Sequence, residues 1–266
     1  MGAAIELITG RALNPGAALV ALTPNTGDSF QVRSTPDANP PRLVGLWGSC
    51  ATSGLIRLRS PRMHDPVQGI KFTVSSNQRK NLLPDEAEQL LYSQDVLTFE
   101  IAGGGAETDA GAFLVHYPDL GGSAARLAMW EQVKPLIKNI ITVTVAIAGP
   151  VTAGDWSAGT AINATVDLLH ANADYAVLGY KTDVDCLAVA IKGSDTANYR
   201  VGGPGTNDAL ETRDFFVTLS KNRQVPAIPI INQANRASTL AHAVHTTAAG
   251  TIVADFIMAE LASSPV

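Results

Sequence analysis

The sequence predicts an all-β protein with a few short helices, built as two consecutive β-sandwiches. Two observations lead to this fold class. Short segments in which every second residue is apolar alternate with clusters of Gly, Pro, Asn and Asp along the 266-residue chain. In addition, a stretch of the first half returns with a similar pattern half a chain length later. Short strands at regular spacing, bounded by turn residues, are typical of sandwiches and barrels.

The alternation is clearest in five segments of the first half. Successive side chains of a strand point to opposite faces of a sheet, so each segment is predicted to be a strand with one face on a core. The segments are AIELIT (4–9), DSFQVRS (28–34), LIRLRS (55–60), VLTFEIA (96–102) and AFLVHY (112–117). Turn and loop residues separate them at NPG (14–16), NTGD (25–28), PDANPP (36–41) and GGG (103–105).

An internal repeat links the two halves. LVGLWGSCATSGLIRLR (43–59) aligns without a gap with AVLGYKTDVDCLAVAIK (176–192), at an offset of 133 residues. The alignment places Trp47 on Tyr180 and Leu58 on Ile191. Because Leu58 and Ile191 occupy the same place in alternating strands, both are expected to be buried.

A second similarity extends the repeat. TDAGAFLVHY (108–117) is similar to TAAGTIVADF (247–256) at an offset of 139, which places six extra residues in the second half. We therefore infer a tandem duplication, with a first sandwich over residues 1–133 that ends in a helix and linker, and a second over 134–266. Each is expected to have about eight strands and a helix before the last two.

Four segments are predicted to be helical. The first has Pro84 and acidic residues in its first turn, the second stops at Pro135, and the third has Asn207 or Asp208 as its N-cap. The segments are LLPDEAEQLLY (82–92), SAARLAMWEQVK (123–134), NDALETRDFFVTLSKN (207–222) and INQANRASTLAHAVH (231–245).

Composition favours assembly and disfavours nucleic-acid binding. Hydrophobic residues make up 46% of the chain and charged residues 16%, so part of the surface is expected to be covered by other copies or partners. The net charge is -5 and the basic residues are scattered, so direct nucleic-acid binding is not expected. We also expect a soluble chain with no secretory signal and no transmembrane segment, since the longest uncharged stretch (139–154) is too short and is broken by Gly149 and Pro150.

The candidate sites for chemistry are weak. His242 and His245 would lie one helical turn apart and could share a metal, but no third ligand stands at a familiar spacing. Asp183 and Asp185 fit a solvent-facing pair at a strand start better than a calcium site. The remaining histidines, His64, His116 and His170, are isolated, so a solvated or capping role is expected for them.

Cysteine and glycine motifs add no activity. Cys50 and Cys186 are expected to be buried free thiols, and a disulfide stays open. IAGGGAETDAG (101–111) and VGGPGTND (201–208) lack the spacing of a phosphate-binding loop, and GSCATSG (48–54) does not fit GxSxG. No catalytic, cofactor-binding or metal-binding residue and no cofactor is predicted, so the chain is not expected to be an enzyme.

The layout resembles the double jelly-roll major capsid proteins of tailless icosahedral viruses. The resemblance rests on two consecutive sandwiches, an aligned strand pair in each (LVGLWG to LIRLR, AVLGYK to CLAVAIK) and a helix late in each half. It covers the whole chain as architecture and matches no motif of that family residue by residue. It implies tandem jelly-roll-like sandwiches and a structural virion protein, assembled in the host cytoplasm.

By the same resemblance, the subunit would form a homotrimer of pseudo-hexameric outline that tiles a shell, with other virion proteins as further partners. Three copies of a two-domain subunit present six similar edges and can pack hexagonally. Two alternatives stay open. A phage tail, spike or other appendage protein would form a ring or fibre. A jelly-roll carbohydrate-binding module or cupin-like enzyme would need a concave aromatic or histidine-lined site, whereas Trp47, Trp130 and Trp156 lie in different predicted elements.

Overall fold

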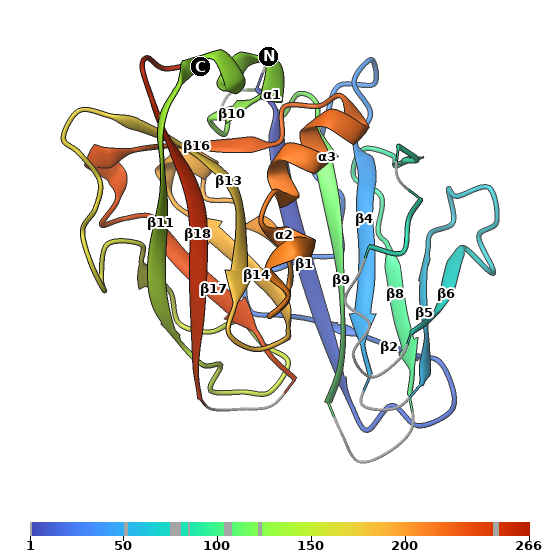
Figure 1. Ribbon diagram of the computed structural model, residues 1–266. Helices are drawn as coiled ribbons and strands as arrows, with labels where there is room; N and C mark the ends of the chain where they lie inside the picture. The colour runs from blue at the N-terminus through green and yellow to red at the C-terminus, as the bar shows by residue number, and fades with distance from the viewer. Residues whose placement is uncertain are drawn as a thin grey trace.

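The computed structural model describes residues 2–50, 53–74, 81–84, 86–103, 108–121, 124–246 and 250–266. Two β-sandwiches stand side by side, and helices α2 (Ala209–Thr212) and α3 (Phe215–Arg223) lie between them (Figure 1). Both ends of the chain lie at the same end of the molecule (Figure 1). The predicted all-β class with a few short helices is confirmed.

The first sandwich consists of two sheets. One has the strand order β3-β1-β9-β4-β7 and the other the order β2-β8-β5-β6. The strands are β1 (Ala4–Leu13), β2 (Val20–Ala21), β3 (Thr23–Pro24), β4 (Arg42–Ser49), β5 (Gly54–Arg59), β6 (Ile70–Val74), β7 (Gln89–Leu90), β8 (Thr98–Ala102) and β9 (Thr108–Tyr117).

The second sandwich also consists of two sheets, ordered β10-β16-β13-β18-β11 and β12-β17-β14-β15. The strands are β10 (Leu127–Ala128), β11 (Ile137–Ala148), β12 (Thr160–Ala161), β13 (Asp174–Thr182), β14 (Cys186–Lys192), β15 (Val201–Gly205), β16 (Ile228–Asn232), β17 (Leu240–Val244) and β18 (Thr251–Leu261). The remaining short helices are α1 (Trp130–Val133), η1 (Lys134–Leu136), η2 (Ser194–Thr196) and η3 (Gln233–Asn235).

The two sandwiches have the same topology. When the short strands β3 and β10 are left aside, the orders are β1-β9-β4-β7 with β2-β8-β5-β6, and β11-β18-β13-β16 with β12-β17-β14-β15. Counted in chain order within its own half, each sandwich pairs its first strand with its eighth, and its eighth with its third. Two four-stranded antiparallel sheets connected in this way form a jelly roll. The fold is thus a tandem of jelly-roll sandwiches, as expected.

A β-bulge occurs at the same place in both halves. The register of β4 with β9 shifts between Leu43 and Gly45, and that of β13 with β18 shifts between Val177 and Gly179. The matching bulges equate Gly45 with Gly179, at an offset of 134 residues. Such bulges are specific features of a strand rather than defects.

The bulges correct the alignment of the two halves locally. They place Leu46, not Trp47, on Tyr180, so the predicted pairing of Trp47 with Tyr180 is wrong by one residue. Leu46 is paired with Phe113 and Tyr180 with Phe256, which gives β9 and β18 an offset of 143 instead of the predicted 139. A one-residue shift moves a side chain to the other face of a sheet.

The first sandwich has a core of its own between its two sheets. This core includes Ile8, Leu58 and a cluster of three aromatic rings, Phe30, Phe99 and Phe113. The Phe99 and Phe113 rings meet edge to face, with centroids 5.3 Å apart. Leu58 is 0% exposed and Ile191 2% exposed, so the predicted burial of both is confirmed.

A second, larger core joins the two sandwiches. It includes the interior of the second sandwich together with the outward side chains of β1, β4 and β9, among them Leu7, Trp47 and Leu114. The alternation in β1 and β9 predicted strands with one buried face. Instead, Ala4 to Gly10 and Asp109 to Tyr117 are buried throughout, because the second sandwich covers the other face.

Tertiary contacts override the helix predicted over 82–92. Within its described residues, this segment makes a turn, in which Ala87 N donates to Pro84 O at 3.2 Å, and follows β4 on either side of that turn. Leu82 N donates to Leu46 O at 2.8 Å, Leu91 N donates to Pro41 O at 2.8 Å, and β7 pairs with the start of β4. Leu83 and Leu91 are both buried, but at two separate places along β4 and not on one face of a helix.

Two other predicted helices are mostly strand or turn. In 123–134, only α1 is α-helical, because Arg126 is held in an extended conformation by hydrogen bonds of its N to Asp195 O and of its O to Ile230 N. In 231–245, η3 is followed by strand β17. The predicted strand over 28–34 is reduced to one bridge, Gln31 with Val96.

The helix predicted over 207–222 is present as α2 and α3, with a break at Arg213 and Asp214. Asp208 caps α2, since its carboxylate accepts a hydrogen bond from Leu210 N at 2.8 Å. Within the described residues, no helix is long and apolar enough to cross a membrane.

Truncation of Leu58 tests the core of the first sandwich. Leu58→Ala should lower the free energy of unfolding by about 2 to 5 kcal/mol, because it leaves a cavity among fully buried side chains. Denaturant titration measures this loss. Leu13→Ala is the control, since Leu13 is 70% exposed. A loss for Leu58→Ala as small as that of the control would contradict the packing described above.

Candidate assembly surfaces

The contact between the sandwiches is the most extensively built surface of the molecule. The outward face of β1, β4 and β9 packs on β14, β15 and α3 of the second sandwich. Two backbone carbonyls of the second sandwich accept hydrogen bonds across it. Leu7 N donates to Arg200 O at 2.8 Å, and Trp47 Nε1 donates to Leu187 O at 2.7 Å. In the opposite direction, Arg223 donates to Val44 O at 3.2 Å.

A buried polar cluster fixes one end of this contact. Asp28 accepts hydrogen bonds from Arg200 at 2.6 Å, from Trp156 Nε1 at 2.8 Å and from Thr9 Oγ1 at 2.8 Å. The Arg200 guanidinium also lies over the Trp156 ring, 4.7 Å from its centroid. The Asp28 and Arg200 side chains are only 4% and 11% exposed. Burial raises the pKa of Asp28, while Arg200, Trp156 and Thr9 oppose that rise.

The turn that carries Asp28 is held by the second sandwich as well. Thr26 N and Thr26 Oγ1 each donate to the Asp155 carboxylate at 2.9 Å, and Asn25 donates to Gly154 O at 2.6 Å. Arg11 forms an ion pair with Asp155 at 3.2 Å. These residues could not be identified from the sequence, because each partner stands alone in it and Asp28 is 172 positions from Arg200.

Most of the counterpart strands of the two joined faces are uncovered, and they lie at opposite ends of the molecule; β13, the counterpart of β4, is covered by α2 and α3. Figure 1 shows β11 and β18 on the side away from the first sandwich, and β5 and β6 on the side away from the second. By topology, β11 and β18 correspond to β1 and β9, and β5 and β6 correspond to β14 and β15. The burial patterns differ accordingly. Cys186 to Ile191 of β14 are all buried, whereas only Ile56 and Leu58 of β5 are.

The open face of β11 and β18 is flat, with small and apolar side chains. Ile140 is 59% exposed, and the outward residues of β11 below it are Thr142, Thr144, Ala146 and Ala148. Opposite them in β18 lie Ile257, Asp255 and Val253, all half-buried. Thr144 Oγ1 donates to Asp255 at 2.6 Å. The face thus offers apolar area with few charges, which suits contact with another protein surface.

The open face of β5 and β6 is cationic. Glu100 of β8 accepts hydrogen bonds from Arg57 at 2.7 Å and from Arg59 at 2.9 Å. Lys71 of β6 is exposed beside them. Two arginines therefore share one carboxylate, and Lys71 lies near a second one, Asp65 in the loop before β6.

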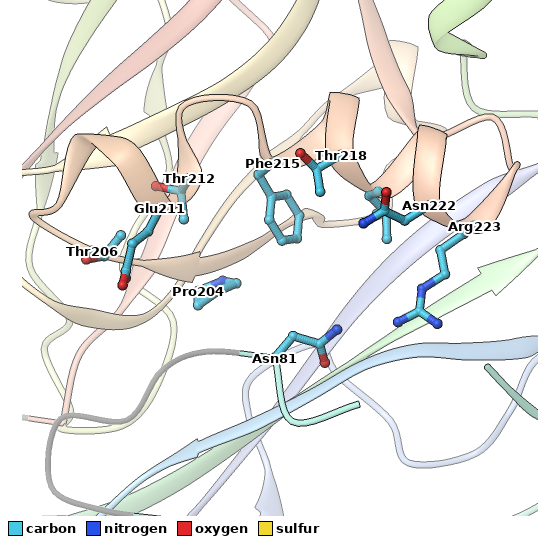
Figure 2. A pocket seen from close by; sticks show the side chains of 10 residues that line it. Asn81, Pro204, Thr206, Glu211, Thr212, Phe215, Thr218, Asn222 and Arg223 are labelled. Atoms are coloured by element: carbon cyan, nitrogen blue, oxygen red, sulfur yellow. The ribbon is translucent and has the colours of Figure 1, made fainter. Parts of the chain in front are cut away.

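A cavity of about 350 Å³ lies between the sandwiches, beneath α2 and α3. Figure 2 shows Phe215 and Arg223 pointing from α3 toward Pro204 and Asn81. The side-chain Oδ1 of Asn81 accepts from Leu46 N at 3.1 Å within the first sandwich, and Arg223 of the second sandwich donates to Pro84 O at 3.1 Å. The cavity is part of the contact between the sandwiches, and its lining includes one aromatic ring, Phe215.

His116 is buried at the same contact. It lies on β9 between Ile5 of β1 and Arg42 of β4. Its side chain is 2% exposed, and neither ring nitrogen has a hydrogen-bond partner among the described residues. Burial, and secondly the charge of Arg42, lower the pKa of His116 to about 4. The expectation of a solvated or capping histidine is wrong here.

The histidine pair does not lie on a helix. His242 belongs to strand β17, where its Nδ1 lies 3.1 Å from Ser157 O and its ring meets Trp156 edge to face. His245 follows the end of that strand, and its carbonyl accepts from Gly154 N at 2.7 Å. The geometry of one helical turn that would let both bind one ion is therefore not present. Among the described residues, no group of three His, Cys, Asp or Glu side chains could hold a metal.

The acidic pair serves the turn between β13 and β14. Asp183 accepts a hydrogen bond from Val253 N at 2.9 Å and Asp185 accepts one from Asn207 N at 3.1 Å. The two carboxylates therefore bind different segments. Cys50 and Cys186 are buried thiols that form no disulfide within the described residues, as predicted, and burial raises the pKa of Cys50 to about 12.

The glycine-rich segments give no phosphate site. Gly202, Gly203 and Gly205 lie within strand β15, where close contacts with β14, Phe215 and Tyr180 leave no room for side chains. Parts of the other two segments, at residues 51–52 and 104–107, lie outside the described residues.

No protein-family model and no curated protein sequence matches the chain. Among solved structures, the STIV MCP is similar over 98% of this chain and 88% of its own, with 10% identity and a TM-score of 0.22. The atomic structure of Sulfolobus Turreted Icosahedral Virus contains a chain similar over 98% of this chain and 92% of its own, with 9% identity and a TM-score of 0.21.

A third similar structure is a β-porphyranase of glycoside hydrolase family 86 from Bacteroides plebeius. It is similar over 91% of this chain and 38% of its own, with 8% identity and a TM-score of 0.21. TM-scores of this size carry no argument about function, so the architectural resemblance rests on the strand orders described above.

Removal of the Asp28 charge tests the polar cluster. Asp28→Asn should lower the free energy of unfolding by about 3 kcal/mol, since it leaves the buried Arg200 guanidinium without its counter-ion. Denaturant titration at neutral pH measures the loss, and Asp37→Asn at an exposed position is the control. If both variants lose less than about 0.5 kcal/mol, the ion pair does not hold the contact.

The pKa of His116 predicts a pH dependence of stability. At pH values between 6.5, the ordinary pKa of histidine, and about 4, the pKa of His116 in the folded chain, the unfolded chain binds a proton at this residue and the folded chain does not. Stability from this group is therefore complete above pH 6.5 and falls by about 3 kcal/mol as the pH decreases to about 4. His116→Leu should lack that part of the pH profile.

Denaturant midpoints measured between pH 7 and 4 give this comparison, with exposed His64→Leu as the control. A wild-type profile that runs parallel to that of His116→Leu would mean that His116 is not buried in the neutral form.

Proposed function

We propose that the protein is a structural shell subunit of a virion, a major capsid protein that assembles as a homotrimer of pseudo-hexameric outline. One observation carries the proposal. The face of β1, β4 and β9 and the face of β14 and β15 are joined within the chain. Of their counterparts, β13 is covered by α2 and α3, whereas β11 with β18 and β5 with β6 are uncovered at opposite ends (Figure 1). Such a subunit can repeat its internal contact between copies. Three copies would then close a ring of six sandwiches.

A tandem duplication is part of this proposal. The same strand orders and the bulges before Gly45 and Gly179 support descent of both sandwiches from one unit. The domains would be residues 1–133 and 134–266, although β10 already pairs with β16 of the second sandwich. We propose a non-enzymatic protein without cofactor or nucleic-acid contact, located in the virion after assembly in the host cytoplasm, with other virion proteins as further partners.

A tail or appendage protein remains the second candidate, for a specific reason. The contact between unlike faces is heterologous, and a heterologous contact closes into a ring or continues as a filament, depending on its rotation. The carbohydrate-binding alternative has less support, since one aromatic ring lines the cavity beneath α2 and α3.

Light scattering on the purified protein tests the proposal. We expect a mass three times the 27.8 kDa of one chain at micromolar concentration, and tiles of hexagonal outline in negative-stain images. A chelator should leave the mass unchanged, because no metal is expected to hold the copies together. A stable monomer would contradict the shell function, filaments would favour the appendage alternative, and dissociation by chelator would contradict the assignment of no metal.

A further inference from the structure

We infer that the face of β11 and β18 in one copy binds the face of β5 and β6 in the next, and that Thr142 N donates a hydrogen bond to Gly69 O across this contact. The inference rests on the proposed function, since it requires that copies assemble. The residues of the contact between copies are derived from the contact between the two sandwiches within one chain.

Thr142 stands in the position of Leu7. In the first sandwich, Leu7 pairs with Leu114, which pairs with Gly45 after the bulge. In the second sandwich, Thr142 pairs with Ile257, which pairs with Gly179 after the bulge. In each sandwich, these three paired residues form a row across the sheet, with one residue each from the first, eighth and third strands. The row of Thr142 and Ile257 is therefore the counterpart of the row of Leu7 and Leu114.

Gly69 stands in the position of Arg200. Leu58 pairs with Ile70, the first residue of β6, and Ile191 pairs with Val201, the first residue of β15. The alignment of the two halves matches Leu58 with Ile191, and both side chains are buried in alternating strands, so it also matches the residues that precede β6 and β15. Because Leu7 N donates to Arg200 O at 2.8 Å, the corresponding bond between copies joins Thr142 N to Gly69 O.

The upper edge of β11 is available for such a bond. Among the described strands, β11 has one neighbour, β18, whereas the other edge of β1 is covered by β3 and Arg200. Lower down, Ala146 N donates to Thr165 Oγ1 at 3.4 Å, which covers the edge there as β3 covers Gly10 and Arg11. An unpaired strand edge is a ready site for another chain.

The charges of the two faces are complementary. On the β5 and β6 side, Arg57 and Arg59 pair with Glu100, and exposed Lys71 lies near Asp65 in the loop before β6, so three cations stand against two carboxylates. On the β11 and β18 side, Asp255 pairs across the sheet with Lys181, and exposed Asp183 lies beside Val253. One face is thus net positive and the other net negative. Such complementarity steers association and fixes the register of a contact.

Crosslinking between copies tests the pairing. Gln68 is exposed and directly precedes Gly69, so Thr142→Cys with Gln68→Cys should bring two thiols within disulfide distance across the contact. Diamide oxidises the two thiols to a disulfide and takes up their two hydrogens. Denaturing gels without reductant should then show covalent trimers. The matched control is Thr142→Cys with Gln31→Cys, an exposed glutamine of the same sandwich. The native cysteines are buried in both proteins.

The outcomes separate the inference from the proposed function. Covalent trimers with Gln68→Cys and monomers with Gln31→Cys support the inference. Monomers on both gels, from a protein that light scattering finds as a trimer, overturn the inference and leave the proposed function standing. A wild-type monomer overturns the proposed function. A ladder beyond three copies supports the contact but contradicts closure of the ring.

A second variant covers the case in which the double-cysteine protein does not fold. Ala146→Arg places a long cation on the flat face of β11 and should weaken self-association at least tenfold in sedimentation experiments. Leu210→Arg on α2 is the control, since Leu210 is 70% exposed and away from that face. Equal association of the two variants would overturn the inference.

Discussion

The burial of the outward face of β1, β4 and β9 is the constraint on which the rest of the structure depends. A jelly roll normally exposes one face of each sheet, but here Leu7, Trp47 and Leu114 must be removed from water on that second face. The second sandwich provides the cover with β14, whose residues from Cys186 to Ile191 are buried on both faces. Neither sandwich is therefore an independent unit in its present sequence, although each has a complete set of eight strands.

Glycines permit this close approach between elements. A Cβ at Gly179 would lie 2.4 Å from the backbone of Arg213, so the break between α2 and α3 can rest directly on β13. A Cβ at Gly203 would lie 2.4 Å from the Phe215 ring. Both glycines thus allow the helices to fill the space between the sandwiches, where Tyr180 packs against Phe215 and Phe216.

The strands could be predicted from the sequence because period-two alternation and turn residues are local signals. The helices predicted over 82–92 and 231–245 are wrong, because the apolar residues of these turns and strands also fit a helical period. The competing hydrogen bonds of Leu82 and Leu91 come from β4, which is distant in sequence. The repeat predicted the burial of Leu58 and Ile191 correctly. Its offset of 133 residues is one too small for β4 and β13, where the strand pairing gives 134 on both sides of the bulges, so Trp47 was displaced by one position.

The residues of the contact were harder still to predict. Asp28, Trp156 and Arg200 come together from three distant segments, and none belongs to a recognisable motif. The low share of charged residues indicated covered surface without saying where it is. The duplicated topology supplied the location, because it allows a buried face in one half to be compared with an exposed face in the other.

The rigid cluster around Asp28 has a geometric consequence. With hydrogen bonds from Arg200, Trp156 and Thr9, and with Asp155 holding the adjacent Thr26, the cluster fixes the angle between the two sandwiches. In a lattice built from this subunit, that angle determines how far each tile is domed. The curvature of the lattice, and with it the radius at which it closes, would then be encoded in a few side chains inside the subunit as well as in the contacts between tiles.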